Sequence, residues 1–125
     1  MTSKLKQLVL RVAPAFKLLS LAAMGVIAWQ SLQPSTGIVT LNHGDKLLHF
    51  LAYGLLATLL RLGWPRSWGG TLLLVSVGFG IIVEILQGTM SLGRTASIAD
   101  AIANTVGAIT ALFILHVLKR RISAP

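Results

Sequence analysis

The chain has 125 residues, of which 54% are hydrophobic and 11% are charged, and its formal net charge is +8. A soluble domain carries about a quarter of its residues as charged side chains, so this composition excludes a soluble enzyme with separate cofactor and substrate domains. Cysteine is absent, which excludes disulfide bonds, thiolate catalysis and cysteine-ligated metal centres. In a membrane chain a basic excess sets topology and contacts anionic lipid. We therefore expect membrane lipids, and no nucleic acid, as partners.

Apolar segments long enough to cross a bilayer make up most of the chain. The first follows a basic segment that is expected to break at Pro14, and Pro34 to Gly37 ends it. Between the second and third segments, Trp64 to Trp68 contains Pro65 and predicts an interfacial turn. A bilayer-spanning helix needs about 20 apolar residues, and we expect such spans over 16–33, 46–64, 68–87 and 98–118. The sequence predicts an all-α fold, a polytopic bundle of four transmembrane helices forming a single membrane domain over 1–125.

The basic residues predict how this bundle is oriented. If four spans alternate, one side holds all but two of them: Lys4, Lys6, Arg11, Lys17, Arg61, Arg66, Lys119, Arg120 and Arg121. Lys46 and Arg94 remain on the other side. Because short cytoplasmic segments are enriched in Lys and Arg, we expect both termini to be cytoplasmic.

The polar residues of the spans fall near the outer ends of the second, third and fourth helices. They repeat at helical spacing as Asp45, His49 and Tyr53, as Glu84 and Gln87, and as Asp100 and Asn104. An ionised group at the centre of a bilayer costs about 2.5–3.5 kcal/mol even on the mildest scale. We therefore expect these polar stripes to meet in a pocket that opens to the outer face.

Two of the acidic residues also have structural explanations. Asp45 is placed to cap the second helix, and Ser97 to Asp100 matches the S-x-x-D capping box. Glu84 follows a long apolar run with no helix start nearby, which makes it the strongest functional candidate. In the fourth span, small residues at fourfold spacing predict close helix packing: Ala99, Ala103, Gly107 and Ala111.

His49 has Asp45 one turn before it as an orienting partner. A zinc site would need His49 together with two carboxylates from other helices, and no compact ligand spacing such as H-x-x-x-H is present. We predict no metal and no cofactor. Arg94, on the outer side near three carboxylates, is suited to pair with them or with a phosphate.

Three ordered motifs resemble the VanZ-like membrane proteins: DKLLHFLAY over 45–53, EILQ over 84–87, and GRTASIAD over 93–100 followed by 104–107. The resemblance implies a small multi-pass protein of the bacterial cytoplasmic (inner) membrane. The namesake of the family confers resistance to teicoplanin, a lipid-tailed glycopeptide that acts on cell-wall precursors. The family pattern falls on Asp45, Lys46, His49, Tyr53, Glu84, Gln87, Arg94, Asp100 and Asn104.

The leading hypothesis is an outer-leaflet polar pocket that binds or processes a lipid-linked cell-wall intermediate or a lipid headgroup. Lys46 and Arg94 would contact its anionic group, and His49, Glu84 and Asp100 would orient it, or act as catalytic acids and bases if the site is enzymatic. Two alternatives stay open: transport of protons or small solutes through the bundle, and a structural scaffold for other envelope proteins.

Overall fold

The computed structural model describes residues 3–33, 44–90 and 95–123. It contains four helices and, in these residues, no strand: α1 (Ser3–Ser31), α2 (Gly44–Gly63), α3 (Gly69–Thr89) and α4 (Ile98–Ser123). Each helix is long and apolar enough to cross a membrane. The predicted all-helical, four-span fold is therefore confirmed.

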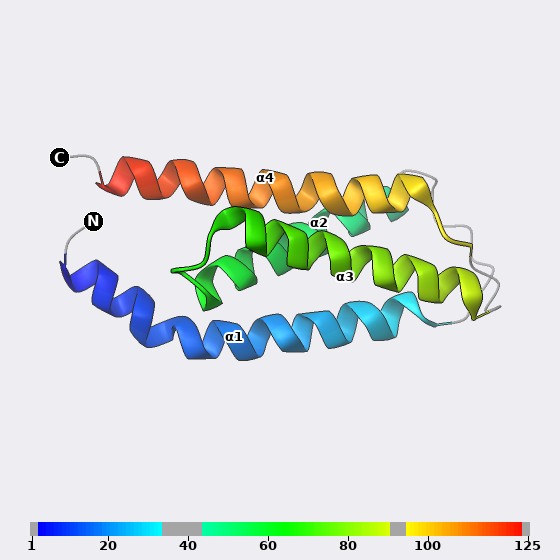
Figure 1. The fold of residues 1–125 in the computed structure, drawn as a ribbon, viewed down its shortest axis with the longest axis horizontal. Coiled ribbons are helices and arrows are strands. Elements are labelled where there is room, and N and C mark those ends of the chain that lie inside the picture. Colours follow the sequence, from blue (N-terminus) through cyan, green and yellow to red (C-terminus); the bar gives the residue numbers. More distant parts are fainter. Residues whose placement is uncertain (1–2, 34–43, 91–94, 124–125) are drawn as a thin grey trace.

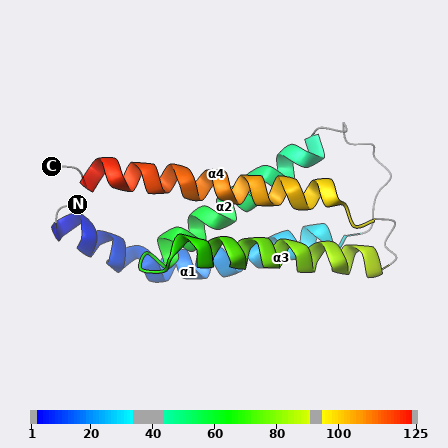
Figure 2. The same ribbon diagram turned by 45° about the horizontal axis from the view of Figure 1, so that its top comes forward.

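The four helices lie roughly along one axis, so that α1 begins and α4 ends at the same end of the bundle (Figure 1). The start of α2, the end of α3 and the start of α4 lie at the opposite end. We call these the terminal end and the polar end, because the acidic residues lie toward the second. In the turned view, α2 runs obliquely across its neighbours (Figure 2). It packs mainly against α4 and then against α1.

The first helix differs from the prediction at its start. The sequence predicts a break at Pro14, but α1 begins at Ser3 and continues through the proline. A proline within a helix removes one backbone hydrogen bond and bends the helix, while the helix can continue on both sides. Figure 1 shows this bend in the first half of α1. The adjacent Ala13 is buried, so packing holds the bent segment on the bundle.

The outer surface of the bundle is apolar. Large hydrophobic side chains point outward from all four helices, including Leu18, Leu74 and Phe113. Polar side chains are among the buried ones, notably Glu84, Gln87 and Asn104. The buried residues also include apolar ones such as Leu56 and Leu72. An apolar outer surface with polar side chains inside suits a hydrocarbon surrounding, where a polar group must find its partners inside the protein.

Close helix contacts depend on glycines. A Cβ atom on Gly107 of α4 would lie 2.1 Å from the carbonyl oxygen of Phe50 in α2, so only glycine allows the two helices to approach this closely. At the terminal end, a Cβ atom on Gly63 would lie 2.9 Å from the backbone nitrogen of Lys17 in α1. The predicted small-residue ridge is correct at Gly107, which is buried, and wrong at Ala99, which is exposed.

Candidate functional site

An ion cluster joins the first turns of α2 and α4 at the polar end. The ammonium group of Lys46 donates a hydrogen bond to Asp100 Oδ1, and its Nζ also lies 3.6 Å from Asp45 Oδ2. The side chains of Lys46 and Asp45 are about half-exposed, whereas only 12% of the Asp100 side chain is exposed. With a neutral histidine beside it, this cluster keeps one net negative charge.

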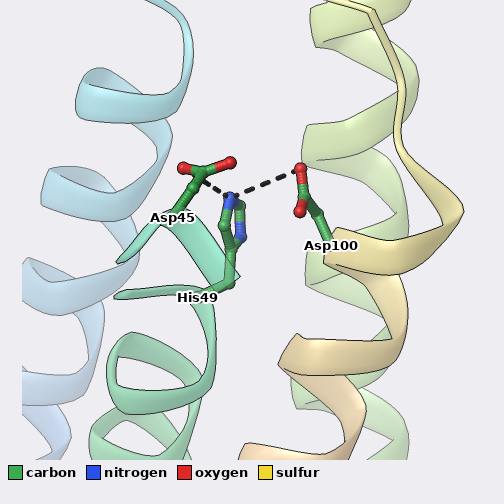
Figure 3. A group of neighbouring side chains, drawn as sticks. All are labelled: Asp45, His49 and Asp100. Carbon is green, nitrogen blue, oxygen red and sulfur yellow. Dashed lines mark ion pairs between the residues drawn. The ribbon is translucent and has the colours of Figure 1, made fainter. Parts of the chain in front are cut away.

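His49 lies on the inner side of this cluster, with one ring nitrogen fixed and the other facing carboxylates. Its Nδ1 lies 2.9 Å from the side-chain oxygen of Asn104 in α4. Because an amide oxygen can only accept a hydrogen bond, Nδ1 carries the proton. The opposite nitrogen, Nε2, lies 3.9 Å from Asp45 Oδ1 and 3.7 Å from Asp100 Oδ2 (Figure 3). In the neutral ring, Nε2 is therefore an acceptor within an acidic surrounding.

Glu84 is held by the start of α4 and does not join the ion cluster directly. Ser97 Oγ accepts the backbone N–H of Asp100 at 3.3 Å, so the predicted cap of α4 is present. In a capping box the acid at the third helical position would accept the N–H of the capping residue. Here Glu84 Oε2 accepts the N–H of Ser97 at 2.9 Å, which leaves the Asp100 carboxylate available to Lys46.

Beneath His49, three buried polar atoms have no hydrogen-bond partner among the described residues: Tyr53 Oη, Glu84 Oε1 and Asn104 Nδ2. They belong to three different helices. A Cβ atom on Gly80, one turn before Glu84, would lie 3.0 Å from the Tyr53 ring and 3.3 Å from Asn104 Nδ2. Gly80 therefore makes the space in which Tyr53 and Asn104 come close to α3. Buried polar atoms of this kind usually bind ordered water or a ligand group.

Gln87, which the sequence analysis placed on a stripe with Glu84, makes a contact that its spacing does not predict. It is buried, and its Nε2 donates a hydrogen bond of 2.7 Å to the carbonyl oxygen of Ser31. That carbonyl belongs to the last turn of α1, where helical partners are missing. Gln87 therefore ties α3 to the end of α1. Pattern analysis missed Ser31 because the contact uses a backbone atom.

A groove of about 360 Å³ lies between α1 and α2 next to the cluster. Its polar lining includes Asp45, His49 and Tyr53 from α2 and Gln30 and Ser31 from α1. The rest of its lining is apolar: Val26, Ile27, Leu48 and Ala52. The groove thus has polar groups toward the polar end and apolar walls deeper along the two helices.

The structure brings most of the predicted site residues together. Lys46, Asp45, His49, Asp100 and Asn104 form one connected network between α2 and α4. Tyr53 and Glu84 lie deeper and are buried. Arg94, to which the sequence analysis assigned phosphate or carboxylate binding, lies outside the described residues, as does His43.

Three of these residues could supply metal ligands. One atom each from Asp45, His49 and Asp100 lie within 4.8 Å of one another, and a set of one imidazole and two carboxylates suits Zn²⁺ or Mn²⁺. The Asn104 contact at Nδ1 is the outer-sphere contact that metal-bound histidines usually have. The Lys46 ammonium, however, already forms an ion pair with Asp100. This positive charge would repel a metal ion at the site.

Comparison with known proteins finds a family model, described as VanZ/LLP1, that matches residues 3–119. No curated protein and no solved structure matches the chain significantly. The family match covers all four helices except the last few residues of α4.

Proposed function

The chain belongs to the VanZ/LLP1 family, and we propose that it binds the headgroup of a lipid-linked cell-envelope amphiphile in the groove between α1 and α2. The observation that carries this proposal is the groove itself. It joins the hydrogen-bonding groups of Asp45 and His49 to an apolar wall that includes Ile27 and Leu48. A ligand with a polar head and an acyl or prenyl chain matches this combination, since binding sites fix orientation with a few polar groups on an apolar lining.

The geometry supports a headgroup that donates hydrogen bonds. Asp45 carries a carboxylate, and His49 presents Nε2 as an acceptor because Asn104 fixes the proton on Nδ1. Hydroxyl, amide or amine groups, such as those of a sugar or a peptide, fit these acceptors. Lys46 does not line the groove, but its Nζ lies 3.6 Å from Asp45, which does. Its side chain is 40% exposed, so an anionic group of a ligand bound in the groove can reach it.

The charge distribution supports an outward-facing groove. The basic residues other than Lys46 and Arg94 belong to segments of the terminal end, and cytoplasmic segments are enriched in such residues. In this orientation the terminal end faces the cytoplasm, and the polar end lies in the outer leaflet of the bacterial inner membrane. Lipid-linked wall precursors are exposed in that leaflet.

Should the site catalyse a reaction, His49 is the residue placed to do so. Its Nε2 borders the groove and can accept a proton from a headgroup hydroxyl, while Asn104 holds the ring. Glu84 is buried deeper and is used by the Ser97 backbone. This part of the proposal predicts turnover that is lost in His49→Gln, which keeps a hydrogen-bonding side chain but cannot accept the proton, while the ligand stays bound.

Lipid retention by purified protein tests the proposal. The protein is purified in mild detergent from a bacterial membrane, and its bound lipids are identified by mass spectrometry for wild type, His49→Ala and Asp45→Ala, two residues that line the groove. We expect an enriched amphiphile in the wild type that both groove variants lose. Thr110→Val is the control, because Thr110 is a partly exposed residue of α4 that lies outside this groove and outside the basic end of α4, and it should retain the lipid. Equal lipid content in the wild type and the groove variants would contradict the proposal.

A scaffold role is the second candidate, and one observation favours it: the polar side chains bridge different helices. Lys46 joins α2 to α4, Gln87 joins α3 to α1, and Glu84 joins α3 to the start of α4. If these bridges serve folding alone, every substitution that weakens lipid retention will lower thermal stability to the same degree. A groove variant with normal stability and no retained lipid would exclude this candidate.

The resistance role of the family's namesake is tested separately. Expression of the chain in a susceptible bacterium should raise the teicoplanin concentration needed to stop growth, and His49→Ala should abolish the rise at equal membrane level. If the teicoplanin concentration needed to stop growth is unchanged, this chain does not share the resistance role of the family's namesake.

A further inference from the structure

A second cavity lies at the terminal end, distant from the polar groove. It has a volume of about 510 Å³, and its polar lining comes from the end of α2, the turn after it and the last turns of α4: Arg61, Ser67, Trp68, His116, Lys119 and Arg120. Arg61 is sixteen residues beyond Asp45 in the same helix, which is about 24 Å along the axis. The two cavities are thus independent sites.

Among the residues that the structure describes, the basic side chains of this cavity have no acidic partner. The whole chain has three acidic residues, Asp45, Glu84 and Asp100, and all of them lie toward the polar end. Arg61 donates one hydrogen bond of 2.7 Å, from Nη1 to the carbonyl oxygen of Ser67, which holds the guanidinium at the cavity and leaves its other N–H donors available. Lys119 and Arg120 make no ion pair with the described residues.

The spacing of residues along α4 places Lys119 and Arg120, but not Arg121, on the side that faces the cavity. Leu112, His116, Lys119 and Arg120 follow one another at spacings of four, three and one residues, so they lie on the side that turns toward Arg61. Arg121, the neighbouring basic residue in the same last turn, is not part of the lining. Basic residues also stabilise the C-terminus of a helix, but Arg121 could do this as well as its neighbours. Helix stabilisation therefore does not explain why Lys119 and Arg120 line a cavity.

The start of α3 adds further positive potential. The N-cap residue Trp68 provides no side-chain hydrogen bond to the helix, and Gly69 lines the cavity. The first N–H groups of a helix carry partial positive charge and favour anions. The Trp68 ring lies against Gly70, where a Cβ atom would lie 2.4 Å from the ring, and it is 77% exposed. A tryptophan in this position marks the level of lipid headgroups.

We propose that this cavity binds the phosphate group of an anionic phospholipid, with Arg61, Lys119 and Arg120 as the charged contacts. Guanidinium and ammonium groups bind phosphate oxygens by charge-assisted hydrogen bonds, and basic pockets between transmembrane helices bind such headgroups. The lipid would neutralise a cluster that the described part of the chain leaves without counter-charge, and its acyl chains would continue along the apolar faces of α2 and α4. The proposal does not depend on the polar groove.

The test uses the full chain in nanodiscs, where both membrane faces are accessible and topology does not influence the result. Binding of phosphatidylglycerol is measured by native mass spectrometry against phosphatidylethanolamine for wild type, R61Q/K119Q/R120Q and the control K4Q/K6Q/R121Q. The control removes the same charge from the terminal end without changing the cavity lining. A direct hydrogen bond to a charged group contributes about tenfold or more in affinity, so the cavity variant should lose at least about tenfold in affinity. The control should stay within about twofold of the wild type.

Two results would overturn the proposal. Equal losses in the two triple variants would mean that the attraction is spread over the terminal end and is not a property of the cavity. Inorganic phosphate, titrated into lipid-free protein in detergent, distinguishes the source of the anion. Phosphate binding as tight as that of phosphatidylglycerol would assign the cavity to a soluble anion, whereas much weaker binding supports the phospholipid. A circular dichroism melt shows whether each variant is folded.

Discussion

His49 of α2 and Asn104 of α4 share a hydrogen bond of 2.9 Å between ring Nδ1 and amide Oδ1. This contact connects the two helices that pack most extensively, and it determines which ring nitrogen faces the groove. It is the contact on which the chemical character of the site depends, because Nε2 can accept a proton from a ligand only when Nδ1 holds its own.

The first prediction concerns this tautomer. In ¹⁵N NMR spectra of histidine-labelled protein, neutral His49 should show a protonated Nδ1 and an unprotonated Nε2. Asn104→Leu removes the acceptor and should give a mixture of tautomers. Hydrogen bonds between membrane helices contribute about 0.6 kcal/mol on average and up to about 1.7 kcal/mol, so a small loss of stability should accompany the change. A predominantly Nε2-protonated ring in the wild type would contradict the assignment.

The second prediction concerns metal binding at Asp45, His49 and Asp100. The Lys46 ammonium already pairs with Asp100 and Asp45, so the wild type should not retain stoichiometric Zn²⁺ after dialysis. Lys46→Met removes the competing charge and keeps the three ligand atoms, so it should bind Zn²⁺ measurably by isothermal titration calorimetry. Adding His49→Ala to Lys46→Met should abolish that binding. Tight zinc binding by the wild type would show that Lys46 moves aside.

The third prediction concerns the contact between α2 and α4. Gly107→Ala would place a Cβ atom 2.1 Å from the carbonyl oxygen of Phe50, and neither backbone can yield without moving a helix. Overpacking of this kind costs at least about 1–3 kcal/mol, so thermal unfolding in detergent should occur at a lower temperature. Gly78→Ala is the control, because nothing lies within 4 Å of its Cβ position. A normal melting temperature for Gly107→Ala would mean that the helices pack less closely.

The fourth prediction separates a structural from a functional role of Glu84. Glu84→Gln keeps an oxygen to accept the Ser97 N–H bond and removes the buried charge. Stability should stay equal or rise, because an uncompensated buried charge is costly. Glu84→Ala, in contrast, leaves that N–H without its partner and should destabilise the fold by about 1–3 kcal/mol. If Glu84→Gln is stable but loses the retained amphiphile, the charge of Glu84 serves the ligand.

The number of helices and the approximate positions of α2, α3 and α4 could be predicted from sequence alone, but the start of α1 at Ser3 could not. Length and hydropathy gave four spans, and the cost of a polar group in hydrocarbon indicated that Asp45, His49, Glu84, Asp100 and Asn104 would turn inward. Both follow from the solvent preference of single residues and from helical periodicity, so no knowledge of neighbours is required. Several of the residues in the family motifs are also buried polar residues, namely Glu84, Gln87, Asp100 and Asn104.

The tertiary structure decided which polar group meets which. Glu84 pairs with the Ser97 backbone and Gln87 with the Ser31 carbonyl, although their spacing placed them on a common stripe. Such pairings depend on the rotation and axial offset of each helix. These are set where backbones touch, at Gly107 against Phe50 and Gly63 against Lys17, and periodicity along one helix carries no information about its offset from another.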